Sequence, residues 1–470
     1  MKKSFITTSI PYVNGQPHIG HALELVQTDA LARAYRLAGY DTYFLTGTDE
    51  NAQKNVESAE KAGVPTQQLV DENSKRFQDL LTPLDLSYDQ FIRTTDKKHI
   101  KGAQELWKRC KKDIYKKTYS GLYCVGCEAF YKDGEFPDNI CPNHNRKLEE
   151  VSEENYFFKL SNYQARILEL ITTDEIQITP DTRKNEVVNF IKKGLEDFSI
   201  SRPATRMKNW GIPVPEDEDQ RMYVWFDALT NYITALDFAD NGELFQKYWQ
   251  DSDLKIHIIG KDIIKFHAIY WIGMLLSADL SLPEKEYVHG FISVKGLKMS
   301  KSLGNVIDPF EMVKIYGTDA VRYYLLREIP SLSDGDFSED RMKQLYESDL
   351  SNELGNLLSR VTTLAAKDGL NMSNNDTPAN NEYVELLLTF KFNDALAKIW
   401  EEIRSINKNI NEQAPWKLTS DERKIILEGW LLQLQNIGLN LKPLLPHSAD
   451  AIIKATTGTI SKIEPLFPRI

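Results

Sequence analysis

Strand-like and helix-like segments alternate at the start of this chain and again near its middle. β-Prone runs at 3–10 and 42–46 flank an amphipathic stretch at 19–37, and similar apolar runs follow at 222–226 and 255–259. Strands that alternate with helices predict a parallel sheet with crossover helices, which is the doubly wound class of α/β folds. The sequence therefore predicts one doubly wound parallel sheet whose two halves are separated by an insertion.

The remaining segments lack this alternation. Short loops around clustered cysteines follow the first half of the sheet, and helical periodicity without strand signals runs from about 345 to the end. We therefore expect an inserted module within the sheet domain and an α-helical bundle after it. The expected regions are the first half of the sheet domain (1–115), the inserted module (116–215), the second half of the sheet domain (216–292), a loop and connecting segment (293–345) and the bundle (346–470).

Composition and charge exclude several classes of protein. The chain has 470 residues, 41% hydrophobic and 27% charged, and its apolar runs are too short for a membrane helix, so we expect no membrane partner. The net charge of -11 repels phosphate overall, so a nucleic-acid partner must be held by local basic patches. The few cysteines, most of them close together, indicate a metal site in a reducing compartment, and we expect a cytoplasmic protein.

Clustered cysteines and a histidine form two close pairs. Two residues separate Cys124 from Cys127, and two separate Cys141 from His144. Thiolate and imidazole ligands in two such pairs suit tetrahedral Zn²⁺, and a complete set of four leaves no position for water. We therefore predict one structural Zn²⁺ per chain. The alternative is a set of unrelated reduced cysteines with a surface histidine.

Two histidines lie where the first strand gives way to a helix. A helix N-terminus presents unpaired N–H groups and the positive end of the helix dipole, which makes it a place for phosphate. His18 and His21 share one helix face and can donate ring N–H groups to phosphate oxygens, while Gly20 leaves room for a flat ligand such as adenine. The alternative is that the two histidines only cap the helix.

A basic segment with two lysines follows far along the chain. Lys298 and Lys301 stand among small hydroxyl residues, and Gly296 and Gly304 bound the segment. Two lysines between glycine hinges can form a mobile clamp for a polyphosphate, although alone they could equally belong to a solvated basic loop. The sequence contains neither a P-loop nor a glycine-rich dinucleotide motif, so phosphate binding would use these two segments instead.

Residues 18–21 and 298–302, taken together, resemble the two signature motifs of class I aminoacyl-tRNA synthetases. Over nearly its whole length the chain further resembles the methionyl-tRNA synthetase family of that class. Four more stretches carry this resemblance: Thr46-Gly47-Thr48-Asp49-Glu50, Tyr223-Val224-Trp225-Phe226-Asp227-Ala228, Ile259-Gly260-Lys261-Asp262 and Ala414-Pro415-Trp416. The resemblance implies a Rossmann-like catalytic domain split by a zinc-binding insertion, followed by an α-helical anticodon-binding domain.

The resemblance implies a two-step reaction. Methionine and ATP give methionyl-adenylate and pyrophosphate, and the methionyl group then passes to the 3′ end of tRNA. Catalysis would rest on positioning and charge stabilisation around the α-phosphate, with Mg²⁺ accompanying ATP. The implied catalytic residues are His18, His21, Lys298 and Lys301, and the implied ATP-binding residues are Gly20, Gly260, Asp262 and Ser300.

A methionine slot needs an anion for the ammonium group and polarizable, apolar surroundings for the thioether. By resemblance, Asp49 binds the ammonium group, and the Tyr232 hydroxyl can donate a hydrogen bond to sulfur. Plain core packing is the alternative for each aromatic residue taken alone. Many relatives have histidine and glycine where this chain has Asn51 and Ala52, which leaves the role of that histidine open. The implied methionine-binding residues are Ile10, Tyr12, Asp49, Trp225, Ala228, Leu229, Tyr232, Ile263 and His267.

The resemblance also implies nucleic-acid partners. Family members carry a zinc knuckle near the acceptor end of the tRNA, and unpaired anticodon bases are stacked and read by side chains of the helical domain. The implied partners are initiator and elongator tRNA(Met), ATP and L-methionine, and we expect a monomer because the chain stops soon after its last helix. The implied zinc ligands are Cys124, Cys127, Cys141 and His144, and the implied anticodon readers are Asn356, Arg360 and Trp416.

Alternatives remain at this stage for one segment and for the function. The basic stretch 97–117 is either a solvated helix face or a contact for tRNA phosphates, which would weaken steeply with salt. The chain could also be a synthetase for another apolar amino acid or a non-catalytic tRNA-binding paralogue. The intact histidines and lysines argue against the paralogue, because a binding protein has little use for a pyrophosphate clamp.

Overall fold

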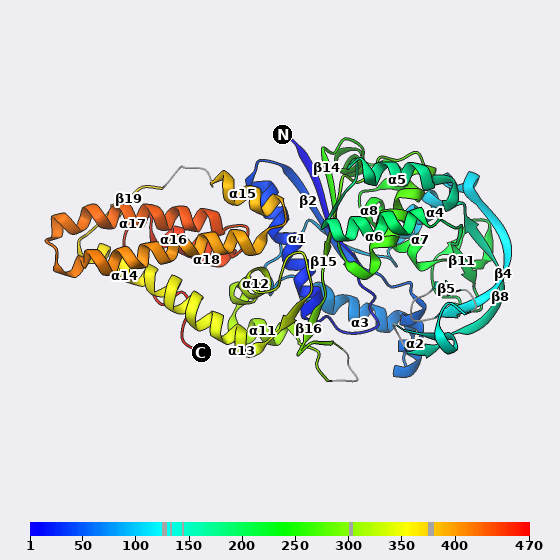
Figure 1. The fold of residues 1–470 in the computed structure, drawn as a ribbon, viewed down its shortest axis with the longest axis horizontal. Helices are drawn as coiled ribbons and strands as arrows, with labels where there is room; N and C mark the ends of the chain where they lie inside the picture. Colours follow the sequence, from blue (N-terminus) through cyan, green and yellow to red (C-terminus); the bar gives the residue numbers. More distant parts are fainter. Residues whose placement is uncertain (125–128, 132–133, 143–144, 300–303, 375–379) are drawn as a thin grey trace.

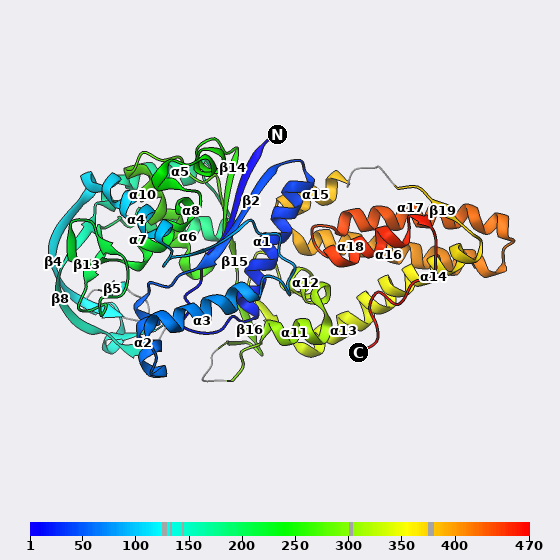
Figure 2. The same cartoon turned by 180° about the vertical axis from the view of Figure 1, so that it is seen from behind.

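A computed structural model gives the fold of the chain (Figure 1). The molecule is elongated, with the parallel sheet near its middle, a helical part at one end and a β-rich part at the other (Figures 1 and 2). The structure describes residues 1–124, 129–131, 134–142, 145–299, 304–374 and 380–470.

Six parallel strands form the central sheet. In spatial order they are β3 (Gln90–Arg93), β2 (Asp41–Thr48), β1 (Lys3–Thr8), β14 (Leu254–Gly260), β15 (Lys285–His289) and β9 (Gln177–Thr179). Along the chain, β2 and β3 extend the sheet on one side of β1, and β14 extends it on the other side. The strand order therefore reverses between β1 and β14. The predicted parallel sheet is confirmed, and doubly wound sheets bind ligands at such a point, outside the carboxyl ends of the strands.

Two segments differ from the sequence-based expectation. Strand β9 lies inside 116–215, the range expected for the inserted module, yet it pairs in parallel with β15 at the edge of the central sheet. The apolar run 222–226 does not join that sheet, because it ends β13 (Asp217–Met222) and begins helix α7 (Val224–Leu229). Short apolar runs are compatible with either a buried strand or a buried helix, since they carry no clear period.

Helices cover both faces of the sheet. Successive strand residues point to opposite faces, so Phe5 and Ile6 are both buried but belong to different hydrophobic cores. On the Ile6 face, α1 (Ile19–Leu37) contacts β1, β2 and β14, and α12 (Thr318–Arg327) packs against α1. The helices that contribute to the Phe5 core are α4 (Lys97–Arg109), α7, α8 (Asn231–Thr234), α9 (Glu243–Phe245), α10 (Ile272–Ser277), α5 (Gln164–Thr172) and α6 (Asp181–Lys192).

The β-rich end is built around one long antiparallel pair. Strands β4 (Ile114–Cys124) and β8 (Glu149–Phe158) pair along almost their whole lengths, and they lie at the edge of the molecule in both views (Figures 1 and 2). The shorter strands are β5 (Ala129–Tyr131), β6 (Ile140–Cys141), β7 (Arg146–Lys147), β10 (Phe198–Ser199), β11 (Ser201–Pro203) and β12 (Pro213–Val214). Helices α2 (Gln53–Ala62) and α3 (Thr66–Asp79) lie between β2 and β3 in sequence.

The C-terminal part is helical, as its periodicity predicts. Its apolar residues continue the core on the α1 face of the sheet, so the two parts share one hydrophobic core. No helix within the described ranges is long and apolar enough to cross a membrane. The elements from the connecting segment onward are β16 (Ile292–Val294), β17 (Leu297–Lys298), α11 (Pro309–Tyr316), β18 (Gly335–Phe337), α13 (Glu339–Leu345), α14 (Asn356–Lys367), β19 (Asn371–Met372), α15 (Asn381–Leu388), α16 (Phe392–Gln413), α17 (Ser420–Leu441), α18 (Pro446–Ala455) and β20 (Gly458–Thr459).

Candidate functional site

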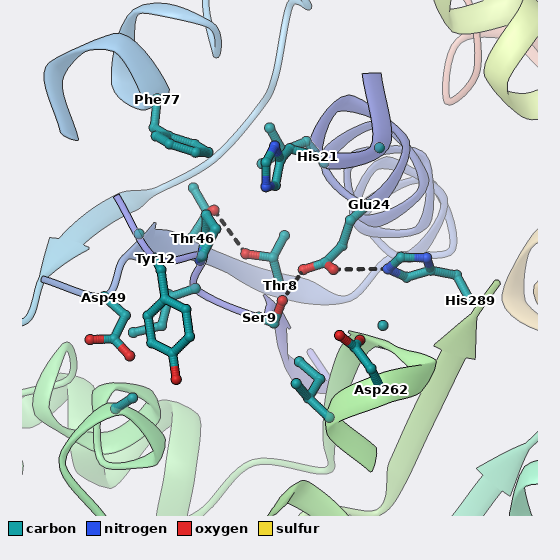
Figure 3. A pocket seen from close by; sticks show the side chains of 18 of the residues that line it. Thr8, Ser9, Tyr12, His21, Glu24, Thr46, Asp49, Phe77, Asp262 and His289 are labelled. Carbon is teal, nitrogen blue, oxygen red and sulfur yellow. Dashed lines mark hydrogen bonds and ion pairs between the residues drawn. The ribbon is translucent and has the colours of Figure 1, made fainter. Parts of the chain in front are cut away.

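A cavity of about 360 Å³ lies at the carboxyl ends of β1 and β14, where the strand order reverses. Figure 3 shows side chains from the segments after β1, β2, β14 and β15 converging on it. Ser300 and Lys301 lie outside the described residues. The sequence-predicted residues that line the cavity are Ile10, Tyr12, His18, Gly20, His21, Asp49, Trp225, Ala228, Leu229, Tyr232, Gly260, Asp262, Ile263, His267 and Lys298.

The two histidines at the start of α1 form a reciprocal cap. Nδ1 of His18 accepts a hydrogen bond from the N–H of Gly20 (3.1 Å), and Nδ1 of His21 accepts one from the N–H of His18 (3.0 Å). The two rings stack with their centroids 3.8 Å apart. A Cβ atom at Gly20 would lie 3.0 Å from the His18 ring, so glycine also keeps space for this cap. The capping alternative is therefore correct for one nitrogen of each ring.

These caps determine what the second nitrogen of His21 can do. Burial, together with the neighbouring His18 and His289, lowers the pKa of His21 well below its usual value, so the ring is neutral at physiological pH. A neutral imidazole whose Nδ1 accepts a hydrogen bond carries its proton on Nε2. His21 therefore has an Nε2–H donor beside the cavity, and capping and anion binding use different atoms of the same ring.

Asp49 lies on the wall of the cavity formed by the segment after β2. Its N–H donates to the carbonyl oxygen of Pro11 (2.9 Å) in a short parallel bridge with Tyr12. The Asp49 side chain is almost fully buried, and its Oδ1 accepts a hydrogen bond from the N–H of Asn51 (3.2 Å). Figure 3 shows the carboxylate next to the Tyr12 ring. The site thus places an anion beside an aromatic surface.

Aromatic rings form the apolar part of the cavity. Trp225 stacks on Phe266 with centroids 3.9 Å apart and planes inclined by 5°, and it meets Tyr12 and His267 edge-on. A thioether sulfur gains about 0.3–1.5 kcal/mol from each aromatic contact. These walls therefore suit a side chain that contains a thioether sulfur.

The Tyr232 hydroxyl, which the sequence predicts to contact the substrate sulfur, donates its hydrogen bond to His267 in this structure. The hydroxyl lies 2.8 Å from Nε2 of His267, and Nδ1 of that ring lies 3.0 Å from the carbonyl oxygen of Ile263. Burial lowers the pKa of His267 to about 4, so the ring is neutral. Because Nδ1 must donate to the carbonyl, Nε2 accepts and Tyr232 donates.

Sequence reasoning missed a polar chain on the Asp262 side of the cavity. Glu24 on α1 accepts a hydrogen bond from Oγ of Ser9 (2.6 Å) and pairs with Nε2 of His289 (2.8 Å), as Figure 3 shows. Burial alone would lower the pKa of His289, but its hydrogen bond and ion pair with Glu24 outweigh burial and raise it. His289 stands at the carboxyl end of a strand, and this position is the signal that could have identified it.

A buried carboxyl group lies on the sheet beneath the cavity. Glu286 on β15 is fully buried beside His257, its register partner on β14, and neither of its carboxyl oxygens has a hydrogen-bond partner among the described residues. His257 hydrogen-bonds Thr7 (2.8 Å) and stacks on Tyr232 with centroids 4.0 Å apart. Burial raises the pKa of Glu286 to about 8, so this carboxyl group is protonated in the folded protein at neutral pH.

Glu286→Gln is expected to stabilise the protein at alkaline pH. Glu286 ionises near pH 4.5 in the unfolded chain and near pH 8 in the folded one, so the wild type loses stability between these values and the glutamine variant does not. One pKa unit corresponds to about 1.4 kcal/mol, and we expect a gain of a few kcal/mol at about pH 8.5 that vanishes near pH 4. Thermal unfolding midpoints at both pH values measure this difference, and an equal shift at both would contradict a protonated Glu286.

The basic stretch 97–117 is paired with acidic residues from distant parts of the chain. The paired carboxylates cancel much of the local positive charge, which favours the solvated helix face over a contact with tRNA phosphates. The salt bridges are Lys98–Asp237, Lys101–Asp240, Lys111–Glu216, Lys112–Asp279 and Lys116–Asp217.

The predicted zinc ligands are only partly described. Cys124 and Cys141 are buried in one small cluster with Leu122 and Leu148, whereas Cys127 and His144 lie outside the described residues. Within the described ranges, no group of three histidine, cysteine, aspartate or glutamate side chains is arranged to hold a metal ion.

The three predicted anticodon readers lie on the helical part. Asn356 and Arg360 belong to α14, and Nη2 of Arg360 donates to Oδ1 of Asn411 on α16 (3.0 Å). Trp416 follows α16 and has 55% of its surface exposed. An aromatic ring that stays this exposed is available to stack on a planar ligand.

Comparison with known proteins matches the chain to a described family. Residues 4–150 and 144–362 match the family described as tRNA synthetases class I (M). The methionine–tRNA ligase of Clostridium acetobutylicum is 42% identical over 100% of this chain and 78% of that protein, and the Thermotoga maritima enzyme is 40% identical over 96% and 75%. A structure of Mycobacterium tuberculosis methionyl-tRNA synthetase in complex with methionyl-adenylate has a TM-score of 0.91 and 36% identity, covering 100% of both chains.

The doubly wound sheet, the cavity at its switch point and the family match define a class I aminoacyl-tRNA synthetase. Relatives about 40% identical over nearly the whole chain are methionine–tRNA ligases. The chain belongs to the methionyl-tRNA synthetase family.

Proposed function

We propose that this protein activates L-methionine with ATP to methionyl-adenylate and transfers the methionyl group to the 3′ end of tRNA(Met). The observation that carries the proposal is one cavity in which the Asp49 carboxylate, the Trp225 wall and the His21 donor converge. Relatives named methionine–tRNA ligase, and the methionyl-adenylate complex of the Mycobacterium tuberculosis enzyme, support the same substrates.

In the first step, Asp49 would pair with the substrate ammonium group and leave the substrate carboxylate free to attack the α-phosphorus. A new C–O–P bond forms, the bond to the β-phosphate breaks, and pyrophosphate leaves. The Nε2–H of His21 and the start of α1 would stabilise charge on the α-phosphate. Lys298, together with Lys301 and the Mg²⁺ that accompanies ATP, would balance the departing pyrophosphate, and Asp262 would accept hydrogen bonds from the ribose.

Amino-acid-dependent ATP–pyrophosphate exchange tests the first step, and tRNA charging tests the second. Exchange should be driven mainly by methionine when it is compared with Leu, Ile, Val, Cys and homocysteine. Trp416→Ala should keep this exchange and lose tRNA charging. Exchange driven mainly by another apolar amino acid would show that this amino acid, and not methionine, is the substrate. No exchange with any amino acid would indicate a tRNA-binding paralogue.

We further propose one structural Zn²⁺ held by Cys124, Cys127, Cys141 and His144. The burial of Cys124 and Cys141 in one cluster fits this donor set, because thiolates at a structural site are enclosed by protein. Purified protein should contain about one zinc per chain, and chelation should lower the thermal stability of the inserted module. Protein without metal, or chelation without effect on stability and activity, would contradict the site.

We also propose that Asn356, Arg360 and Trp416 read the anticodon. The exposure of Trp416 and the position of Arg360 on the neighbouring helix support this role, because unpaired bases stack on aromatic and guanidinium planes.

A cytoplasmic location and a monomeric state stay predictions of the sequence.

A further inference from the structure

Asn51 joins two walls of the cavity that come from different halves of the chain. Its N–H donates to Oδ1 of Asp49 (3.2 Å), and its Nδ2 donates to Oδ2 of Asp227 (2.7 Å). Asp49 follows β2, whereas Asp227 lies on α7 between the cavity-lining Trp225 and Ala228. Asn51, only 5% exposed, therefore connects the carboxylate wall, through its backbone N–H, with the aromatic wall, through its side-chain amide.

The contacts around Asn51 use both hydrogens of its amide. The second hydrogen is directed to the carbonyl oxygen of Thr94 (3.2 Å), and the other oxygen of Asp227 lies 2.6 Å from Nε2 of His99. Nδ1 of His99 continues this network to Thr234 (2.8 Å). Asp227 and His99 are fully buried, so losing one donor leaves a buried carboxylate short of a partner.

We propose that Asn51 is a positioning residue for the amino-acid substrate. By holding Asp49 and Asp227, it fixes the separation between the ammonium-binding carboxylate and the Trp225 wall. This inference rests on the proposed function and deepens it, because it concerns the methionine end of the same cavity. Asn51 does not belong to the cavity lining, so it acts through Asp49 and Asp227 without touching the substrate.

The chemistry of this contact decides which residues can occupy position 51. The Asp227 carboxylate requires a hydrogen-bond donor, and the amide of asparagine and the ring N–H of a histidine can both supply one. Aspartate has nearly the shape of asparagine but would place a second carboxylate against Asp227, where like charges repel.

Exchange kinetics of Asn51→Asp and Asn51→His test the proposal. Asn51→Asp should raise KM for methionine by about ten-fold or more while KM for ATP stays close to wild type, because the loss is confined to one end of the cavity. Asn51→His should keep KM for methionine closer to the wild-type value than Asn51→Asp does. Asn440→Asp is the matched control, since Asn440 is also 5% exposed but lies on α17, and it should change neither constant.

Equal increases in both KM values, or an unchanged KM for methionine in Asn51→Asp, would overturn the positioning role. If Asn51→Asp does not fold, Asn51→Ala gives the same comparison with a smaller expected rise. The absence of methionine-dependent exchange in the wild-type protein would instead refute the proposed function, and this inference with it. The wild-type assay therefore separates the two failures before any substitution is made.

Discussion

Replacing His21 by asparagine is expected to remove most of the methionine-dependent exchange while leaving the start of α1 intact. The Oδ1 atom of asparagine can accept the hydrogen bond that the His18 N–H now gives to Nδ1 of His21. Asparagine has no donor at the position of Nε2, which in the neutral ring carries the proton. Removing one preorganised donor to a developing negative charge costs about 10²–10³-fold in rate, so we expect kcat to fall by that factor.

His447→Asn is the matched control for this substitution. His447 lies on α18 with 63% of its side chain exposed, and its nearest acidic partner, Asp85, is 3.6 Å away. This control should leave kcat, both KM values and the thermal midpoint unchanged. An exchange rate close to wild type in His21→Asn would show that the ring caps the helix without acting on the phosphate. A thermal midpoint clearly below that of the wild type would show that asparagine does not preserve the cap, and the loss of activity could then not be assigned to the missing Nε2–H.

The central strands were predictable from the sequence because each carries its own signal. Strands β1, β2 and β14 are runs of six to eight residues rich in β-branched and aromatic side chains, and each ends at threonine or glycine, so the signal lies within the strand itself. β9 has three residues and joins the sheet through its partner β15, so its assignment depends on a contact made far away in sequence. For α7, a run of aromatic and branched residues favours a strand locally, and burial in the Phe5 core selects the helix instead.

The cavity was predictable where its residues stand in motifs and was missed where they stand alone. His21 and Asp49 belong to recognisable stretches next to strand ends, so their meeting follows from the topology. Glu24 and His289 are 265 positions apart, and only the packing of α1 against the sheet shows that they pair. The same limit applies to the basic stretch, whose acidic partners such as Asp237 and Glu216 lie more than a hundred positions away.

A buried arginine joins the sheet to the helical part and is the second position where we expect a large effect. Arg322 on α12 is fully buried, and its Nη2 lies 2.7 Å from Oδ2 of Asp29 on α1. Its guanidinium also donates to the carbonyl oxygens of Leu84, Pro443 and Leu444. Burial alone would raise the pKa of Asp29, but the charge of Arg322 and the other partners of Asp29 outweigh it and hold the pKa below its usual value.

Arg322→Met is expected to lower the free energy of unfolding by about 3–5 kcal/mol, because methionine leaves the Asp29 charge and three carbonyl oxygens without this donor in the interior. Arg341→Met is the matched control: Arg341 pairs with Glu328 at a partly exposed site, and the loss there should stay below about 1 kcal/mol. Urea titrations of both variants beside the wild type measure the two losses. Adding Asp29→Asn to Arg322→Met should recover part of the larger loss, since it removes a buried charge that has lost one of its two arginine partners. Equal losses for the two arginine variants would mean that the shared hydrophobic core, and not Arg322, holds the sheet and the helical part together.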